Sequence, residues 1–501
     1  MENIMLYNST RDNNAIVKSS EAIASGISKE GGLFVPQSIP TFSAEDFANM
    51  KALDYVGRAN YVFKNFLTDF SEEELKYCTE GAYLGSFDEN RPAPLKALNE
   101  KVNILELWHG PTCAFKDLAL QILPNLLTTS AKKVGGGKKT VILVATSGDT
   151  GKAALEGFKD VENTEIMVFY PNDGVSAMQQ LQMNTQAGEN VYVCAINGNF
   201  DDAQTGVKTI FTNDEIKALL DKNNMGFSSA NSINWGRLAP QIIYYVSAYL
   251  DLLDKGEDYL KDGFNVVVPT GNFGNILAAY YAKEMGVPIN KLICASKSHI
   301  VLPEFLNTGV YDRNRAFYTT ISPSMDILIS SNLERMLYEL TGHNDKQVAD
   351  WQNSLKNEGK YTVPPEILAK LKAIFYGGCC DEKGTAETIK NTFNKYNYLI
   401  DTHTSVAVNV YDKYVSETGD NRPVVIASTA SPYKFANSVL EALELEVPAD
   451  EFDAVELLSA KTNTVIPAPI SALKSATVRF NNVCNKEDMN KVVLERLGIN
   501  G

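Results

Sequence analysis

Histidine is scarce in this sequence, and cysteine occurs without the spacing of a metal site. Only four histidines occur in 501 residues, and they are too scattered along the chain to suggest a ligand cluster. The seven cysteines include no C-x-x-C pair. An odd number of cysteines in a long chain indicates reduced thiols in a reducing compartment. We therefore expect no metal centre.

Long apolar runs are also missing, and so is an excess of positive charge. No run approaches the length of a membrane span, and the first residues lack the basic and apolar regions of a signal peptide. Lys and Arg number 46 against 61 Asp and Glu, which gives a formal net charge of −15. This balance argues against a nucleic acid or an anionic membrane as partner, but a small anion can still bind a locally positive site. We expect a cytoplasmic protein.

The chain divides into four regions by pattern. Residues 1–95 carry several short helix signals and predict a helical N-terminal domain. Residues 96–300 alternate short apolar strands with helices, which indicates an α/β core with a parallel sheet covered on both faces. Residues 301–395 break this rhythm and predict a mainly helical insertion. Residues 396–501 resume the strand pattern and are expected to complete the core and end in C-terminal helices.

Lys116 stands among apolar neighbours. It lies between Phe115 and an aliphatic run, 118–120, that predicts the start of a buried helix. Loss of hydration disfavours an ammonium and lowers its pKa, which is what an amine nucleophile or a Schiff-base lysine requires. The alternative is a surface lysine whose stem packs on the protein while its head reaches water beside Asp117, and surface lysines are common. The choice depends on what surrounds Lys116.

Three predicted strands end in loops of small, hydroxyl-bearing or amide-bearing residues that open a helix. The loop at 271–275 brings backbone N–H groups close to a bound phosphate, because glycine carries no Cβ. The loop at 146–150 offers hydroxyls and amides to a carboxylate, and the loop at 428–431 offers further hydroxyls. Ligands of open parallel sheets bind beyond the carboxyl ends of the strands. The three loops are therefore candidates for one site.

The glycine-rich segment at 135–139 does not form a nucleotide-binding motif. It lacks the first glycine of a P-loop, and its strand follows rather than precedes it. No glycine spacing matches the dinucleotide-binding pattern either, so a nucleotide-binding enzyme is disfavoured. A candidate desolvated lysine, a candidate phosphate cradle and a candidate carboxylate cradle together indicate pyridoxal phosphate acting on an amino acid.

Several motifs occur in order along nearly the whole chain, at 110–112, 114–117, 145–151, 197–202, 230–234 with Arg237, 271–275 and 429–432. With these motifs the chain resembles threonine synthase in its longer form with an N-terminal domain and an insertion. This resemblance implies an α/β fold-type II pyridoxal-phosphate enzyme, similar to the tryptophan synthase β chain, with open and mostly parallel sheets.

The resemblance implies a lyase that converts O-phospho-L-homoserine and water to L-threonine and phosphate, in the final step of threonine biosynthesis. Phosphate would be eliminated from Cγ and water added at Cβ. Lys116 would carry pyridoxal 5′-phosphate as the internal aldimine and then act as base and acid. The residues implied to bind the cofactor are Lys116, Gly271, Asn272, Phe273, Gly274, Asn275, Thr429 and Asp149.

The same resemblance implies two substrate subsites. Thr146, Ser147 and Thr150 would hold the substrate carboxylate. Asn231, Ser232 and Arg237 would take the substrate phosphate, for which a planar guanidinium is well suited. The protein would act as a monomer or homodimer, without a nucleic-acid or membrane partner.

Two positions depart from the pattern of the relatives. Asp149 stands where fold-type II enzymes often have Asn, so the partner of the cofactor 3′-oxygen is open. Ser431 stands where the family often has His. His109 is expected to be structural.

The alternatives to a threonine synthase are another fold-type II lyase, such as a cysteate synthase or threonine dehydratase, and a catalytically silent binding protein on the same fold.

Overall fold

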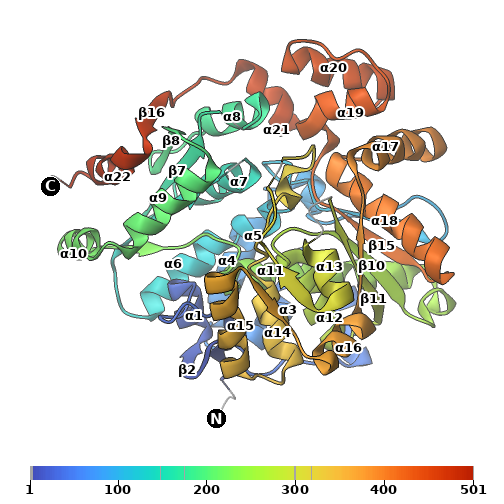
Figure 1. Ribbon diagram of the computed structural model, residues 1–501, viewed down its shortest axis with the longest axis horizontal. Helices are drawn as coiled ribbons and strands as arrows, with labels where there is room; N and C mark the ends of the chain where they lie inside the picture. The colour runs from blue at the N-terminus through green and yellow to red at the C-terminus, as the bar shows by residue number, and fades with distance from the viewer. Residues whose placement is uncertain (1–3, 147, 174, 298–300, 318, 500–501) are drawn as a thin grey trace.

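A computed structural model describes residues 4–499, apart from 147, 174, 298–300 and 318. Within them, two open sheets form the centre of the molecule (Figure 1). All pairings in both sheets are parallel, apart from that of the edge strand β4 (Leu95–Ala97). The predicted α/β fold with mostly parallel sheets is confirmed. The orders are β14 (Phe375–Cys379), β11 (Ile289–Ser296), β10 (Phe264–Pro269), β15 (Val424–Ser428), β5 (Val102–Glu106), β4; and β16 (Asn482–Asn485), β8 (Val191–Asn197), β7 (Thr164–Pro171), β6 (Lys139–Ala145), β9 (Met225–Ser228).

Helices cover both faces of the six-stranded sheet. Along β10, Val266 and Val268 pack in the core that contains α11 (Trp235–Leu252) and α12 (Gly274–Glu284). The alternate residue Val267 packs with α18 (Thr402–Thr418) on the opposite face. Since successive side chains of a strand point to opposite faces, a strand covered on both sides is buried throughout and mostly apolar, as β10 is.

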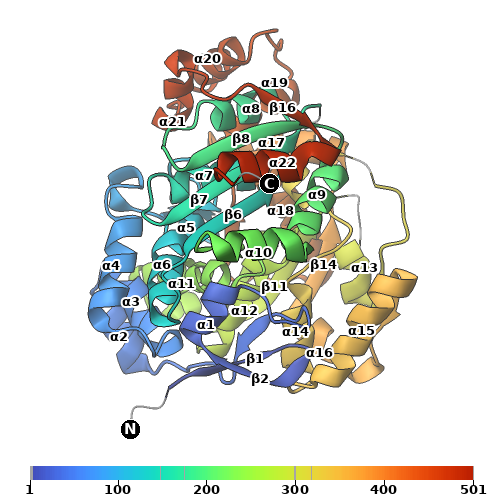
Figure 2. The same ribbon diagram turned by 90° about the vertical axis from the view of Figure 1, so that its left-hand side faces the viewer.

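The five-stranded sheet is covered in the same way (Figures 1 and 2). One face of β6 and β7 packs against α9 (Phe200–Thr212), α10 (Asp214–Lys222) and the terminal α22 (Met489–Arg496). The other face packs in the larger core with α6 (Leu123–Lys133) and α7 (Asp149–Phe158). The last segment of the chain returns as β16 at the edge beside β8. The C-terminal region is therefore part of this sheet's layer.

The first 95 residues contain four α-helices and also a sheet that the pattern does not predict. The helices are α1 (Ser19–Ser25), α2 (Ala44–Lys51), α3 (Tyr55–Phe66) and α4 (Glu72–Tyr83). The three-stranded antiparallel sheet has the order β2 (Asp12–Lys18), β1 (Leu6–Ser9), β3 (Phe34–Pro36). β1 and β2 are mixed in polarity and β3 has only three residues, so they lack the apolar runs that marked the core strands. Trp235 of α11 packs edge-on against Tyr7 and Phe66 and so fixes this region to the core.

The segment at 301–395 is mainly helical, with α13 (Val301–Thr308), α14 (Leu333–Leu340), α15 (Asp345–Glu358), α16 (Pro365–Ile374) and α17 (Glu382–Tyr396). It also supplies β14 to the six-stranded sheet, which makes the segment more than an insertion. The sequence pattern does not predict β14, because two of its five residues are glycines. A Cβ on Gly377 would lie 2.9 Å from the Cα of Pro303, and one on Gly378 would lie 2.6 Å from Val410. Close packing of α13 and α18 on the two faces therefore requires residues that are poor strand formers.

No helix within the described residues has both the length and the hydropathy needed to cross a membrane.

Candidate active site

Lys116 lies at the start of α5 (Asp117–Leu120), and its side chain is 12% exposed. Its Nζ lies 3.4 Å from the Ser324 hydroxyl oxygen and 3.7 Å from Asp149 Oδ2. Burial lowers the pKa of the Lys116 ammonium, Asp149 opposes the shift, and the nearby charges of Lys434 and Arg237 lower the pKa further. The surface alternative for Lys116 is therefore wrong, because its amine is buried among polar partners.

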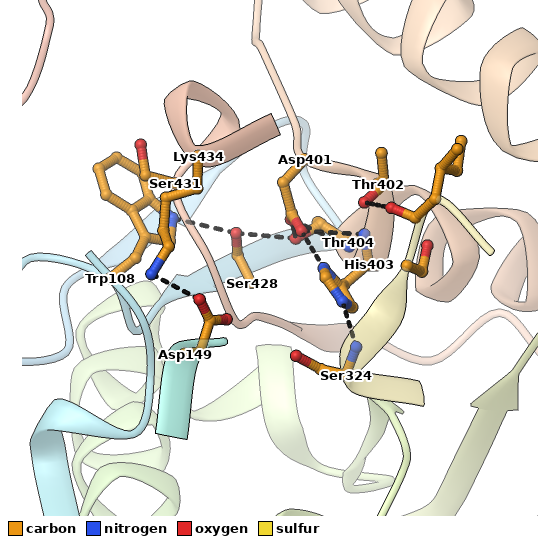
Figure 3. A network of polar contacts seen from close by, with 12 residues as sticks. Trp108, Asp149, Ser324, Asp401, Thr402, His403, Thr404, Ser428, Ser431 and Lys434 are labelled. Carbon is orange, nitrogen blue, oxygen red and sulfur yellow. Dashed lines mark hydrogen bonds and ion pairs between the residues drawn. The ribbon is translucent and has the colours of Figure 1, made fainter. Parts of the chain in front are cut away.

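Asp149 begins α7, and its carboxylate joins two lysines. Oδ1 lies 2.7 Å from Lys434 Nζ (Figure 3). Oδ1 also accepts a hydrogen bond of 3.1 Å from Gln179, while Oδ2 faces Lys116. The Lys434 side chain is fully buried and also donates to the Thr112 carbonyl. Burial alone would raise the pKa of Asp149, but Lys434 and Lys116 hold it well below its ordinary value. The carboxylate is therefore ionised beside the amine.

A buried carboxylate also shapes the turn before Lys116. Asp117 accepts hydrogen bonds from the backbone N–H and the hydroxyl of Thr112, at 2.8 and 2.6 Å. Burial raises the pKa of Asp117 to about 6, with the Thr112 bonds opposing the shift. A Cβ on Gly110 would lie 2.6 Å from the Asp117 side chain, so the turn requires glycine there. His109 lies 2.8 Å from Glu106 and stacks on Trp108, which fits the expected structural role.

The loop after β6 has a different geometry from the one expected for Thr146. The Thr146 hydroxyl accepts from the N–H groups of Gly148 and Gly151, both at 3.0 Å, and donates to the Gly148 carbonyl. Thr146 therefore shapes the turn and has no hydroxyl hydrogen left for a ligand. Thr150 is half-buried in the first turn of α7. Ser147 lies outside the described residues.

The loop after β10 forms a cradle at the start of α12. Phe273 has φ of 63°, a left-handed conformation that is uncommon for a residue with a side chain. A Cβ on Gly271 would overlap the carbonyl oxygen of Ser324. Tyr245 donates to Asn275 Oδ1, but the buried Asn275 Nδ2 has no hydrogen-bond partner among the described residues. Free N–H groups at a helix start and an unpaired amide suit an anionic group.

Arg237 lies in the first turn of α11, and only 4% of it is exposed. Its Nη1 donates to the Ala230 carbonyl at 2.8 Å, and its Nε has no partner among the described residues. Burial lowers the pKa of Arg237 to about 10. In the described part of the chain no carboxylate lies within ion-pair distance of this guanidinium. A buried cation without an anion is expensive, so this arrangement indicates an anionic ligand.

The segment before Arg237 is held by α14. Asn332 donates to the Ser232 carbonyl at 3.2 Å, and its own backbone N–H donates to the Asn272 carbonyl at 3.1 Å. Arg335 donates to the Ile233 carbonyl at 2.5 Å. Asn332 therefore connects the glycine loop with the segment that carries Ser232. Asn231 is exposed at the edge of the site.

The third loop lies against the Lys116 segment. The Phe115 N–H donates to the Thr429 carbonyl at 2.9 Å, and the Ser431 N–H donates to the Cys113 carbonyl at 3.1 Å. Thr429 is buried, and the Ser431 hydroxyl accepts from the Tyr433 N–H. All three strand-end loops therefore come together near Lys116, as the sequence pattern predicts.

Comparison with known proteins gives consistent results. Residues 6–83 match the family model "Threonine synthase N terminus", and residues 404–493 match "Threonine synthase, C-terminal". A threonine synthase of Pseudomonas aeruginosa is 35% identical over 480 residues, which cover 95% of this chain and 99% of that protein. The chain belongs to the threonine synthase family.

The crystal structure of pyridoxal-phosphate-bound threonine synthase from Brucella melitensis is similar over 98% of this chain and 99% of that one. It has a TM-score of 0.87 and 34% identity. The fold is thus the fold-type II architecture of the threonine synthase family. Human "Threonine synthase-like 1" is 39% identical over 437 residues, or 85% of this chain. The chain spans 58% of the length of that relative.

Sequence reasoning missed several residues that this threonine synthase family member brings to the site. Lys434 carries a usable signal, because it is a lone lysine between apolar neighbours just after the 428–431 loop, as Lys116 is beside Phe115. Ser324 and Asn332 carry no such signal, because they lie in the irregular 301–395 segment. Only the folded chain places them beside Lys116 and the glycine loop.

Proposed function

We propose that this protein is a pyridoxal-phosphate-dependent lyase that converts O-phospho-L-homoserine and water to L-threonine and phosphate. Arg237 carries this proposal, because it is a buried guanidinium with an unpaired Nε that acts electrostatically on Lys116. A phosphate on the substrate would supply the missing anion through charge-assisted hydrogen bonds. Membership of the threonine synthase family supports the same substrate.

The residues present fit the cofactor. Lys116 provides an amine of lowered pKa, Gly271–Asn275 provides backbone N–H groups and an unpaired amide for a phosphate, and Thr429 provides a hydroxyl for the pyridine nitrogen. Asp149 is proposed as a cofactor-binding residue, because its ionised carboxylate faces the Lys116 amine. When bound, the cofactor ring accepts the electron pair that remains on a substrate carbon after that carbon has lost its proton.

The side chains around the cofactor site would divide the work. Lys116 would take protons from Cα and the neighbouring carbons and return them, because burial favours its neutral amine. Thr150 and the N–H groups at the start of α7 would hold the substrate carboxylate, in a turn that Thr146 shapes. Asn231, Ser232 and Arg237 would hold the phosphate that leaves.

A neutral hydroxyl at Thr429, in place of a carboxylate, would leave the pyridine nitrogen without an enforced proton. We propose that this weakens the electron sink and favours elimination and replacement.

We place the reaction in the cytoplasm, since the described cysteines are all free thiols and most are buried.

Parallel assays of phosphate release from O-phospho-L-homoserine and ammonia release from L-threonine test the proposal. Threonine formed with an equal amount of phosphate is the expected result. Dominant deamination of threonine would favour a dehydratase. Protein that acquires no cofactor absorbance on addition of pyridoxal phosphate would favour the silent binding protein.

A further inference from the structure

Ser324 lies between Lys116 and the glycine loop, in the short helix η4 (Pro323–Met325). Its hydroxyl accepts from Lys116 Nζ, its carbonyl packs on Gly271, and its N–H donates to His403 Nε2 at 3.3 Å. We propose that Ser324 is a catalytic residue, whose hydroxyl orients the Lys116 amine, and that His403 is the residue that positions Ser324. This inference rests on the proposed function, because it takes Lys116 as the cofactor lysine.

His403 is suited to hold a backbone N–H in place. Its Nδ1 lies 2.8 Å from Asp401 Oδ2, and only 2% of the residue is exposed. The Ser324 N–H is only a donor, so His403 Nε2 must accept and the ring proton lies on Nδ1, where it donates to Asp401. The carboxylate therefore selects the tautomer that accepts the Ser324 bond, as it does in other carboxylate–imidazole pairs.

The Asp401–His403 pair is anchored to the core. Asp401 caps α18 by accepting from the N–H groups of His403 and Thr404, and it also accepts from the Thr404 hydroxyl. The Ser428 hydroxyl lies 3.0 Å from the Thr404 hydroxyl oxygen, and Trp108 Nε1 donates to Ser428 Oγ at 3.1 Å (Figure 3). The imidazole is thereby fixed to the ends of α18 and β15. It does not depend on the segment that carries Ser324.

His403 and its neighbour attach that segment to the core. The Thr402 hydroxyl donates to the Ile321 carbonyl at 2.8 Å, and His403 accepts from Ser324 three residues further on. Figure 3 places Ser324 next to the His403 ring, at the end of this series of contacts. Loss of the His403 acceptor would release Ser324 while leaving the sheet and helices intact.

A hydroxyl near the Lys116 amine complements the carboxylate of Asp149. Asp149 is charged and favours the ammonium, whereas Ser324 is neutral and accepts a hydrogen bond without adding a charge. A lysine that takes up and returns protons needs an orienting partner that does not trap it as an ammonium. The Ser324 hydroxyl meets that requirement.

The experiment compares Ser324→Ala, His403→Leu, His403→Gln and the double variant Ser324→Ala/His403→Leu with the wild-type holoenzyme. Ser322→Ala is the matched control, because Ser322 lies two residues away and its buried hydroxyl has no partner among the described residues. The readouts are kcat and KM, the absorption spectrum of the bound cofactor, the Lys116 adduct trapped by borohydride, and Tm.

We expect Ser324→Ala and His403→Leu to lower kcat by about tenfold or more, with KM changed by less than about threefold. The cofactor absorption band should shift in both variants, with full Lys116 adduct and unchanged Tm. His403→Gln should regain most of kcat, because its amide oxygen reaches toward the Nε2 position. The kcat of the double variant should be no lower than that of the slower single variant, since both substitutions remove the same contact between Ser324 and Lys116.

Unchanged kcat and spectrum in Ser324→Ala would overturn the catalytic role. Multiplicative losses in the double variant, or a fall in Tm of His403→Leu without a kcat change, would overturn the positioning role. A loss in Ser322→Ala as large as that in Ser324→Ala would overturn both roles. A wild-type protein that traps no adduct at Lys116 would instead refute the proposed function, so the two failures are distinguishable.

Discussion

Two parts of the site treat buried positive charge in opposite ways. Around Lys116, two buried lysines share the carboxylate of Asp149, and Lys434 has a second partner in the Thr112 carbonyl. Around Arg237, the buried guanidinium has one carbonyl partner and an unpaired Nε. In the first part both amines have polar partners within the protein, whereas in the second the unused Nε requires an anion to complete its hydrogen bonding.

A second buried arginine, Arg335, shows which property of Arg237 indicates a ligand. Burial lowers the pKa of Arg335 to about 10, just as it does for Arg237. Arg335, however, donates to the Phe34 carbonyl at 2.9 Å, and to Asn332 and the Ile233 carbonyl at 2.5 Å each. Burial alone therefore does not identify a ligand site. What distinguishes Arg237 is the hydrogen-bonding capacity that the protein leaves unused.

Replacement of Lys116 should have the largest effect. Lys116→Ala is expected to lower kcat by about a thousandfold or more, because it removes both the cofactor attachment and the proton carrier. Phosphate release and borohydride trapping measure the two losses. Tm should not fall, since burial disfavours the ammonium that is removed. Near wild-type turnover in this variant would refute the assignment of Lys116.

Arg237→Ala should act on substrate binding. Loss of a charge-assisted phosphate contact is expected to raise KM for the phosphorylated substrate by about 10- to 100-fold, with a smaller change in kcat. Inorganic phosphate should raise the Tm of the wild type and fail to do so in the variant. The Tm of the unliganded variant should be unchanged or higher, because an unpaired buried charge is gone.

Arg335→Gln provides the contrast. It breaks hydrogen bonds that the protein itself satisfies, so it should lower the free energy of unfolding by at least about 2 kcal/mol. If Arg237→Ala lowers Tm as much as Arg335→Gln does, both arginines are structural. The comparison between the two regions would then fail.

Lys434→Met should remove one of the two cations that contact Asp149 and leave Lys116 in place. Burial lowers the pKa of Lys116 and Lys434 lowers it further, so this variant should move the pH dependence of cofactor capture to higher pH. The pKa of Asp149 is depressed in the folded protein, so its stabilisation is present above the unfolded pKa and is lost as pH falls through the folded value. Without Lys434 that folded pKa rises, and acid unfolding should begin at higher pH.

The control is Lys152→Met, which removes a buried lysine of α7 that pairs with Glu156 and hydrogen-bonds Gln186. Both lysine variants should lose stability, by about 3 kcal/mol or less. Only Lys434→Met should shift the pH dependence of cofactor capture. Equal shifts in the two variants would show that Asp149 and Lys434 do not tune Lys116.

The core strands were predictable because they are short apolar runs ended by small residues, as in β6, β10 and β15. The order of strands in the sheets was not, because it depends on crossovers between segments far apart in the chain. β14 was missed for a physical reason, since tight packing places glycines where a strand pattern needs branched residues. The hairpin of β1 and β2 was missed because its strands are short and partly polar.

The site was predictable where one loop carries its own chemistry. Gly271–Asn275 is such a loop, and Arg237 belongs to a recognisable motif. Thr146 shows the limit of this approach, because its side chain is of the expected type but its hydroxyl is used within the turn. Ser324 and Lys434 act through contacts between distant segments, which no local pattern contains.

The smallest expected effect tests the glycine loop, which lies beside the Lys116 region and is linked to the Arg237 region through Asn332. In Gly271→Ala the new methyl group would meet the Ser324 carbonyl, so the loop or η4 must shift. Cofactor affinity should fall by about tenfold, while KM for the phosphorylated substrate at saturating cofactor stays within about twofold. Gly136→Ala is the control, since its nearest neighbour would lie 3.8 Å away, and it should change neither value. If Gly271→Ala instead raises KM and leaves cofactor affinity intact, this loop belongs with the substrate phosphate. The glycine loop would then belong to the Arg237 region, which binds substrate, and not to the Lys116 region, which binds the cofactor.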